Sequence, residues 1–332
     1  METDWESVFA TRYSLKEQSP GTEAKPKQAL AKLSCFIFVA RSDVSFIRTT
    51  LPPLFKMVAK VECKIIVILD ASNAKGVLGE NLEQSELSEV IEILKEIKKQ
   101  HSFEMEVFSP DPNEVLQLSK IHMGRSYRET HCFRGYPIHG SIRQFHKYNS
   151  DYVLHLDCDM LFYEEEGFSW IESAINLMEE NKDILCTLPR GGPPAVDGNL
   201  NQGTTYYRKD DLRGVYLFKN FTSRHYLIHR KRFLELLPMK PLWLSWREPI
   251  KSRLFGNGKM LCWESIVEKA LKNSTLWRAD LMTEKAWSLH PGERSKEFRK
   301  KLPSITEQVS KGNFPVAQAG HFDLRLGDWE IN

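Results

Sequence analysis

The sequence predicts an α/β fold in which helices cover both faces of a mostly parallel sheet. Three short apolar runs, at residues 35–40, 64–69 and 152–156, have the length and the β-branched or aromatic content of buried strands. Segments with helical periodicity accompany them, the clearest at residues 85–99. Alternating strands and helices are typical of crossover connections, so neighbouring strands are expected to run parallel.

Local patterns predict the other elements of the first half. Residues 1–30 are polar and contain turn-forming Pro and Gly, so a loosely ordered tail is expected there. Residues 46–60 are predicted to form a helix in which Pro52 and Pro53 mark the start or a break. A third strand is expected at residues 105–108 and a helix at residues 140–148.

The second half is less regular. Its most distinctive segment, at residues 191–205, is rich in Gly, Pro and Asn and predicts a loop that closes over the site and excludes water. The remaining expected elements are helices at residues 169–181, 231–237 and 260–272 and strands at residues 184–188 and 226–228.

Composition is that of an ordinary soluble protein large enough for one α/β domain or two smaller ones. The chain has 332 residues, of which 41% are hydrophobic and 27% are charged. A net charge of +2, from 46 Lys+Arg against 44 Asp+Glu, gives no general reason to expect nucleic acid as a partner. Two local basic runs, at residues 224–232 and 294–301, are read as solvated surface, with an anionic substrate or lipid surface as the alternative.

Cysteine usage and hydropathy predict a reduced, cytoplasmic protein. The six cysteines include no Cys-x-x-Cys pair, which argues against a structural zinc site. The first thirty residues lack the apolar core of a signal peptide, and no stretch approaches the roughly 20 apolar residues of a transmembrane helix. Peripheral contact with a membrane is left open.

The most informative motif is Asp157-Cys158-Asp159, directly after the apolar run at residues 152–156. Alternate side chains of a strand point to the same face, so Asp157 and Asp159 are expected to point the same way. Carboxylates this close repel each other, and a divalent cation removes the repulsion. The motif therefore predicts a metal site that holds phosphate oxygens; the alternative is a pair of solvated aspartates in a turn.

Two other predicted strands also end in polar side chains. Arg41 follows the run at residues 35–40, and Asp70 follows the run at residues 64–69. In parallel sheets, ligands bind outside the carboxyl ends of the strands. Arg41, Asp70 and Asp157 are therefore expected to meet at one edge of the sheet.

Taken in order, Val39-Ala40-Arg41, Leu69-Asp70-Ala71-Ser72 and Leu156-Asp157-Cys158-Asp159 resemble the GT-A glycosyltransferases, especially those of family 2. The resemblance covers about residues 33–290. It implies a GT-A (Rossmann-like) fold with a nucleotide-sugar-binding half, residues 31–162, and an irregular acceptor-binding and catalytic half, residues 163–332. It also implies hexosyltransferase activity that uses a nucleotide diphosphate sugar, Mn²⁺ or Mg²⁺, and a glycan, lipid-linked or small hydroxyl acceptor.

The same resemblance implies roles for single residues. Asp70 is expected to contact the nucleotide base. The other expected donor contacts are Arg41, Ser72, Arg143 and Asp157. The expected metal ligands are Asp157, Asp159 and His290, with Asp159 more than Asp157 as the direct carboxylate ligand and His321 as the competitor of His290.

For catalysis, the resemblance points to Glu264 in Trp263-Glu264-Ser265 as the general base of an inverting reaction. Family members often carry an acidic pair in this segment, whereas this chain has a single acid. Stabilisation of a helix start is the alternative role for Glu264. Glu248 and Asp210 are the next candidates for the base. Trp243, Trp246 and Trp263 are candidates for stacking on sugar rings, with core packing as the default role of each.

Three other classes of protein fit the motif less well. A nucleotidyltransferase usually has a Gly-rich loop after the first strand, and residues 39–43 contain no glycine. A phosphatase of the haloacid-dehalogenase type usually carries its Asp-x-Asp near the N-terminus. A catalytically silent, glycan-binding domain of the same fold would not need intact Asp157 and Asp159.

Overall fold

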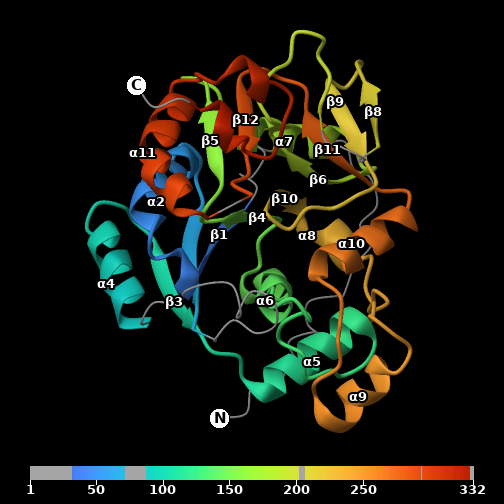
Figure 1. The fold of residues 1–332 in the computed structure, drawn as a ribbon. Coiled ribbons are helices and arrows are strands. Elements are labelled where there is room, and N and C mark those ends of the chain that lie inside the picture. The colour runs from blue at the N-terminus through green and yellow to red at the C-terminus, as the bar shows by residue number, and fades with distance from the viewer. Residues whose placement is uncertain (1–31, 72–86, 202–205, 293, 330–332) are drawn as a thin grey trace, which may run out of the picture. The chain divides into compact units, whose positions relative to one another are not determined.

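The computed structural model describes residues 32–71, 87–201, 206–292 and 294–329 (Figure 1). The tail expected at residues 1–30 and the expected donor contact Ser72 lie outside these ranges. Among the described residues, none of the helices is both long and apolar enough to cross a membrane.

A nine-stranded sheet runs through both predicted halves of the chain, in the order β3-β2-β1-β4-β10-β6-β11-β9-β8. Seven of these described strands point the same way, and β9 and β10 oppose them, which confirms the expected mostly parallel α/β sheet. The strands are β1 (Leu33–Ala40), β2 (Lys64–Asp70), β3 (Glu104–Phe108), β4 (Tyr152–Asp157), β6 (Ile184–Leu188), β8 (Tyr207–Asp210), β9 (Val215–Phe218), β10 (His225–His229) and β11 (Trp277–Leu281).

Helices cover both faces of the sheet (Figure 1). On one face α5 (Pro112–Met123), α6 (His139–Lys147), α8 (Arg230–Leu234) and α10 (Trp263–Lys272) share an apolar core with Phe36 and Phe38 of β1. On the other, α2 (Ile47–Val58) contacts both α4 (Leu87–Lys98) and α11 (Lys296–Ser310), and α7 (Trp170–Glu180) contacts β6. The short helix α9 (Glu248–Phe255) contacts the segment after α5, where Ser252 donates its hydroxyl to Glu129 at 2.6 Å.

The register of the central strands brings their carboxyl ends together. Ala40 at the end of β1 pairs with Asp70 at the end of β2, and Phe38 pairs with Asp157 at the end of β4. A short 3-10 turn, η1 (Arg41–Asp43), follows β1 at this edge. A second sheet is formed by β5 (Leu161–Glu164), β12 (Ala286–Leu289) and β7 (Arg190–Gly191). His290 directly follows β12.

One local expectation is corrected. Pro52 and Pro53 neither start nor break α2 but lie inside it. Each removes one backbone hydrogen bond, and burial of Ile47, Leu51 and Leu54 on the inner face outweighs that loss. Residues 202–205 of the segment expected to close over the site lie outside the described ranges, and in its described part Asn201 donates its backbone N–H to Gly320, 2.7 Å away. Its closure over the site stays a prediction.

Candidate functional site

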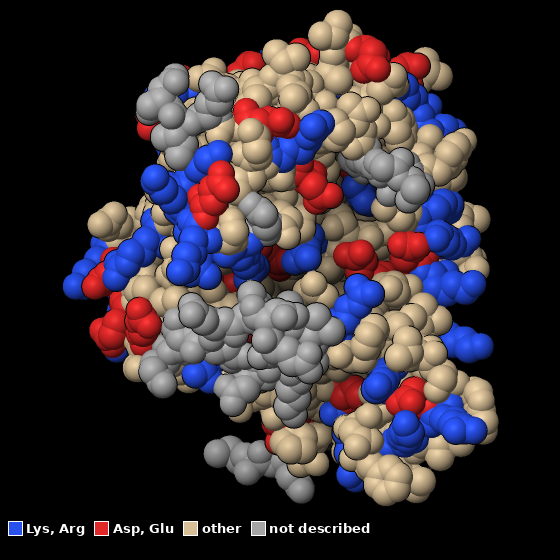
Figure 2. Space-filling model, in the orientation of Figure 1, with Lys and Arg blue, Asp and Glu red and all other residues tan. Residues whose placement is uncertain are grey.

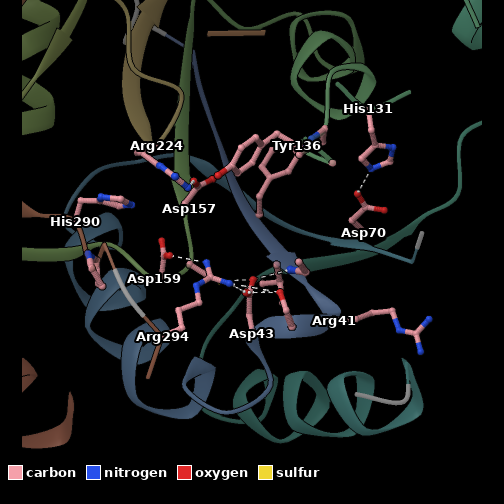
Figure 3. A pocket seen from close by; sticks show the side chains of 18 of the residues that line it. Arg41, Asp43, Asp70, His131, Tyr136, Asp157, Asp159, Arg224, His290 and Arg294 are labelled. Atoms are coloured by element: carbon pink, nitrogen blue, oxygen red, sulfur yellow. Dashed lines mark hydrogen bonds and ion pairs between the residues drawn. The ribbon is translucent and has the colours of Figure 1, made fainter. Parts of the chain in front are cut away.

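A pocket of about 320 Å³ lies at the carboxyl ends of β1, β2 and β4 (Figure 3). Arg41, Asp70 and Asp157 all line it, as the parallel-sheet argument predicts. None of the described residues of the segment 191–205 lines it. The pocket is therefore built by strand ends and by loops next to them, including the connection between α5 and α6.

Asp157 is held as a carboxylate by basic neighbours on both of its oxygens. His155 donates through Nε2 to Oδ1 at 3.2 Å, and Arg224 donates through Nη1 to Oδ2 at 3.4 Å. Burial by itself raises the pKa of Asp157, but His155 and then Arg224 lower it more, so the pKa lies below its usual value. The carboxylate thus keeps its negative charge at neutral pH.

Arg294 links two buried carboxylates in the centre of the pocket (Figure 3). Its Nη1 lies 2.7 Å from Oδ1 of Asp43, and its Nη2 lies 2.7 Å from Oδ2 of Asp159. The side chains of Asp43 and Asp159 are only 6% and 3% exposed, so little water compensates their charges. The other oxygen of Asp159, Oδ1, is buried and has no hydrogen-bond partner among the described residues.

Asp43 is fixed from three further sides. The backbone N–H of Ala40 donates to its Oδ2 at 2.7 Å, and the thiol of Cys158 donates to the same oxygen at 3.1 Å. The hydroxyl of Ser42 donates to Oδ1 at 3.2 Å. Burial raises the pKa of Asp43, and the nearby charge of Arg294 offsets this only in part. Arg294 is therefore the neighbour that most favours the charged form of Asp43.

The opposite end of the pocket contains Asp70 and His131. Nε2 of His131 donates to Oδ2 of Asp70 at 3.0 Å, and Figure 3 shows this pair on the other side of Tyr136 from Asp157. The guanidinium of Arg224 lies 5.6 Å from the centre of the Tyr136 ring, a cation–π contact. An aromatic face and an anchored carboxylate thus lie at one end, and two arginines with Asp157 and Asp159 lie at the other.

His290 lines the same pocket and is oriented by Asp323, which accepts a hydrogen bond from its Nδ1 at 2.9 Å. This contact directs the second ring nitrogen, Nε2, away from Asp323, as is common for metal-binding histidines. The described residues contain no group of three or more His, Cys, Asp or Glu that could hold a metal ion alone. Asp157, Asp159 and His290 therefore share the pocket without forming a complete metal shell.

The structure does not bring every expected residue to the pocket. Arg143 on α6 lies elsewhere, because its guanidinium is paired with Glu106 and with Glu114, the latter at 2.8 Å. His321 is also absent from the lining and lies 3.4 Å from Arg325. Local sequence did not indicate that acids on β3 and α5 face Arg143.

The candidate bases also lie outside the pocket lining. Oε2 of Glu264 accepts hydrogen bonds from the backbone N–H and the hydroxyl of Ser223, at 2.9 and 3.1 Å. Glu248 is buried and accepts from the backbone of Lys259, while Asp210 is paired with Arg213. Ser223 precedes Arg224, which lines the pocket. Glu264 therefore contacts the residue next to a lining residue and does not line the pocket itself.

The lining residues that were not sequence-based candidates include Asp43, His131, Tyr136, Arg224 and Arg294. Asp43 had a signal, since it follows Arg41 directly after the first strand. Arg224 and Arg294 belong to the two basic runs that were read as solvated surface. Only their long-range contacts with Asp157 and Asp159 distinguish them from surface arginines.

No protein-family model matches the chain, and no curated protein matches its sequence. Several solved structures are similar in fold at low identity. A structure of GalNAc-T7 with UDP, GalNAc and Mn²⁺ is 12% identical with a TM-score of 0.47, over 80% of this chain and 44% of that one. An active-site mutant of LgtC is 9% identical with a TM-score of 0.40, over 83% and 95%. TarS from S. aureus is 10% identical with a TM-score of 0.41, over 86% and 41%. The chain thus spans less than half of the GalNAc-T7 and TarS chains.

Proposed function

We propose that this protein is a glycosyltransferase that moves a sugar from a nucleotide diphosphate sugar to a hydroxyl acceptor. The observation that carries the proposal is one pocket with two chemically different ends. Asp157, Asp159, Arg224 and Arg294 are suited to a diphosphate, and Asp70 with Tyr136 is suited to a nucleoside. The order of the strand-end motifs, which resembles GT-A glycosyltransferases, supports the same assignment.

At the diphosphate end, the guanidinium groups of Arg224 and Arg294 are the proposed phosphate contacts. A planar guanidinium binds phosphate oxygens through two parallel N–H bonds and stays charged at all relevant pH values. In this pocket Arg224 lies 3.4 Å from Asp157, and Arg294 lies 2.7 Å from Asp159. When a diphosphate binds, its oxygens would replace these carboxylate oxygens as hydrogen-bond acceptors of the two arginines.

The residues also fit a divalent cation, Mn²⁺ or Mg²⁺, when the diphosphate completes its shell. The buried Oδ1 of Asp159 has no hydrogen-bond partner in the part of the chain that the structure describes, and Nδ1 of His290 donates to Asp323. Such ions are commonly bound by one or two carboxylates together with substrate phosphates. Asp159, Asp157 and His290 would hold the ion, which when bound neutralises charge on the leaving diphosphate. In this pocket Arg224 and Arg294 contribute to the same neutralisation.

At the nucleoside end, Asp70 is the proposed acceptor for hydrogen bonds from the base or ribose. His131 fixes one of its oxygens at 3.0 Å and so orients the carboxylate toward the pocket. The ring of Tyr136 offers a flat face for stacking. Arg41 extends away from Asp157 and Asp159 in Figure 3, on the side of Asp70, where it is a further proposed donor contact.

Changing Asp70 to Ala is expected to weaken nucleoside diphosphate binding at least tenfold without unfolding the protein. A hydrogen bond to a charged group contributes about 1.5–3 kcal/mol, which corresponds to roughly 10- to 100-fold in affinity. Isothermal titration with the nucleotide measures the loss, and circular dichroism checks the fold. The exposed Asp211→Ala is the control. Native-like affinity in Asp70→Ala would show that the nucleoside binds elsewhere.

Glu264 remains the proposed general base of an inverting reaction, and its contact with Ser223 adds a second possible role, the positioning of Arg224. The nearly isosteric Glu264→Gln separates the two. A base role predicts normal donor affinity and a turnover lower by about 100-fold or more. A positioning role predicts that donor affinity falls together with turnover. Glu268→Gln, one turn further along α10, is the matched control, and native turnover in Glu264→Gln would exclude both roles.

The proposed function is tested by thermal unfolding with a panel of nucleoside diphosphates, with and without Mn²⁺. A ligand that binds only the folded state raises the melting temperature. We expect the largest rise with one nucleoside diphosphate in the presence of Mn²⁺, followed by turnover of its sugar conjugate. A rise with nucleoside triphosphates alone would favour a nucleotidyltransferase. Binding without turnover on any acceptor would indicate a silent domain.

A further inference from the structure

The helix α9 (Glu248–Phe255) buries polar side chains and exposes apolar ones, the reverse of an ordinary surface helix. Its inward side chains are polar, with Glu248 6% and Ser252 1% exposed. Its outward side chains are apolar, with Leu254 65% and Phe255 70% exposed. Surface helices of globular proteins normally bury their apolar stripe. The exposed apolar face of α9 therefore needs an explanation other than the folding of this domain.

Buried polar contacts hold α9 in this orientation. Glu129 accepts a hydrogen bond from the hydroxyl of Ser252 at 2.6 Å and from the backbone N–H of Gly258 at 2.9 Å. Glu248 accepts from the backbone N–H of Lys259 at 2.9 Å. A Cβ at Gly258 would lie 2.4 Å from the carbonyl oxygen of Glu248, so only glycine permits this close approach. The outward apolar face is thus built into the fold.

The exposed apolar surface is concentrated in this one segment. Ten large hydrophobic side chains are exposed among the described residues, and five of them fall within residues 244–255. Ile250 and Leu254 are four residues apart on α9, which places them along one side, and Trp246 lies two residues before the helix begins. The five are Leu244 (54%), Trp246 (75%), Ile250 (51%), Leu254 (65%) and Phe255 (70%), here named the α9 patch.

The segment that carries the α9 patch is strongly basic. All of residues 238–260 are described, and the only acid among them is the buried Glu248. In Figure 2, Lys and Arg side chains lie around uncharged surface at the lower right, where Figure 1 places α9, with a few Asp and Glu side chains among them. The exposed basic residues of the segment are Lys240, Arg247, Lys251, Arg253 and Lys259. An apolar face with Trp and Phe, bordered by Lys and Arg, is typical of helices that lie in a membrane interface.

We propose that the α9 patch docks this protein on an anionic lipid bilayer. The apolar tips would enter the headgroup boundary, and the basic residues would face lipid phosphates. A second copy of the chain fits less well, because a two-fold contact would set the basic rim of one patch against that of the other, and like charges across an interface are unfavourable. The docking concerns a surface apart from the pocket, so it is separable from the proposed transferase activity.

The full chain should be mixed with vesicles of phosphatidylcholine alone and with vesicles that also contain phosphatidylglycerol, then sedimented. We expect binding to the anionic vesicles that weakens with salt. In the triple variant Arg247→Gln, Lys251→Gln, Arg253→Gln, affinity is expected to fall by roughly 100-fold, about fivefold for each charge near the surface. In Trp246→Ser, Leu254→Ser, it should fall at least about tenfold, because both apolar side chains lose their burial in lipid.

Leu212→Ser and Val316→Ser are matched controls, since these side chains are 101% and 91% exposed in other parts of the structure. Both should bind vesicles like the native protein. Absence of vesicle binding, or equal binding by all variants, would overturn the proposal. So would a concentration-dependent dimer that is lost in the Trp246 and Leu254 variant, which would assign the patch to a second copy. Thermal stabilisation by nucleoside diphosphates should be unchanged in every variant, so a failure here leaves the proposed function untouched.

Discussion

Replacing Asp159 by Asn is expected to reduce metal-dependent binding of nucleoside diphosphate by about 100-fold or more. Loss of a residue that merely supports a metal ligand typically costs 10- to 100-fold in affinity, and a direct ligand should cost at least as much. The side chain is 3% exposed and its Oδ1 has no protein partner, so nothing in the described pocket replaces it. Titration of the nucleotide with Mn²⁺, with Mg²⁺ and with excess chelator measures the effect.

The chelator experiment also tests the metal itself. If the native protein binds the nucleotide equally well in excess chelator, then Arg224 and Arg294 supply the positive charge and the proposed metal site is wrong. Asp151→Asn is a suitable control, because it changes an exposed aspartate at the opposite end of β4. Circular dichroism should show the native fold for both variants.

Replacing Arg294 by Gln is expected to destabilise the fold by about 3 kcal/mol or more and to weaken nucleotide binding as well. Removing one partner of a buried ion pair leaves an uncompensated charge, and here two carboxylates, Asp43 and Asp159, lose the same partner. Urea unfolding measures the free energy of unfolding. The exposed Arg299→Gln removes a charge from the same basic run and should change stability little.

The pH dependence of the stability lost in Arg294→Gln shows whether the loss comes from the missing charge or from missing packing contacts. Burial raises the folded-state pKa of Asp43 above its ordinary value of 3.8, so its contribution to stability decreases as pH rises through the window between the two values. Without Arg294 this window should extend further upward. The deficit of Arg294→Gln is therefore expected to be largest near neutral pH and to shrink in acid. A deficit that does not change with pH would instead assign it to lost contact with Phe46, whose ring centre lies 5.0 Å from the guanidinium.

Local sequence patterns were enough to predict the central strands of the sheet. Residues 35–40, 64–69 and 152–156 appear as β1, β2 and β4, because short apolar runs of this length favour strands that are buried on both faces of a sheet. The helix α5 was missed although its boundary signals are present, with Asp111 before Pro112 at its start and Gly124 at its end. Its apolar periodicity is weak, and the tertiary contacts of Val115, Leu118 and Met123 make it a helix.

By itself, the sequence determined that Asp70, Asp157 and Asp159 follow buried strands, and parallel pairing then places them at one edge. Only the tertiary structure decided which charges meet there. Arg294 is 135 residues away from Asp159 along the chain, and Arg224 is 67 residues away from Asp157. Likewise, the sequence shows which residues of α9 are apolar, but it does not show the buried contacts of Glu248 and Ser252. Those contacts place the apolar side chains on the outer face of the helix. Strand burial follows from local apolar content, whereas ion pairing and the direction of a helix face depend on distant partners that local patterns do not encode.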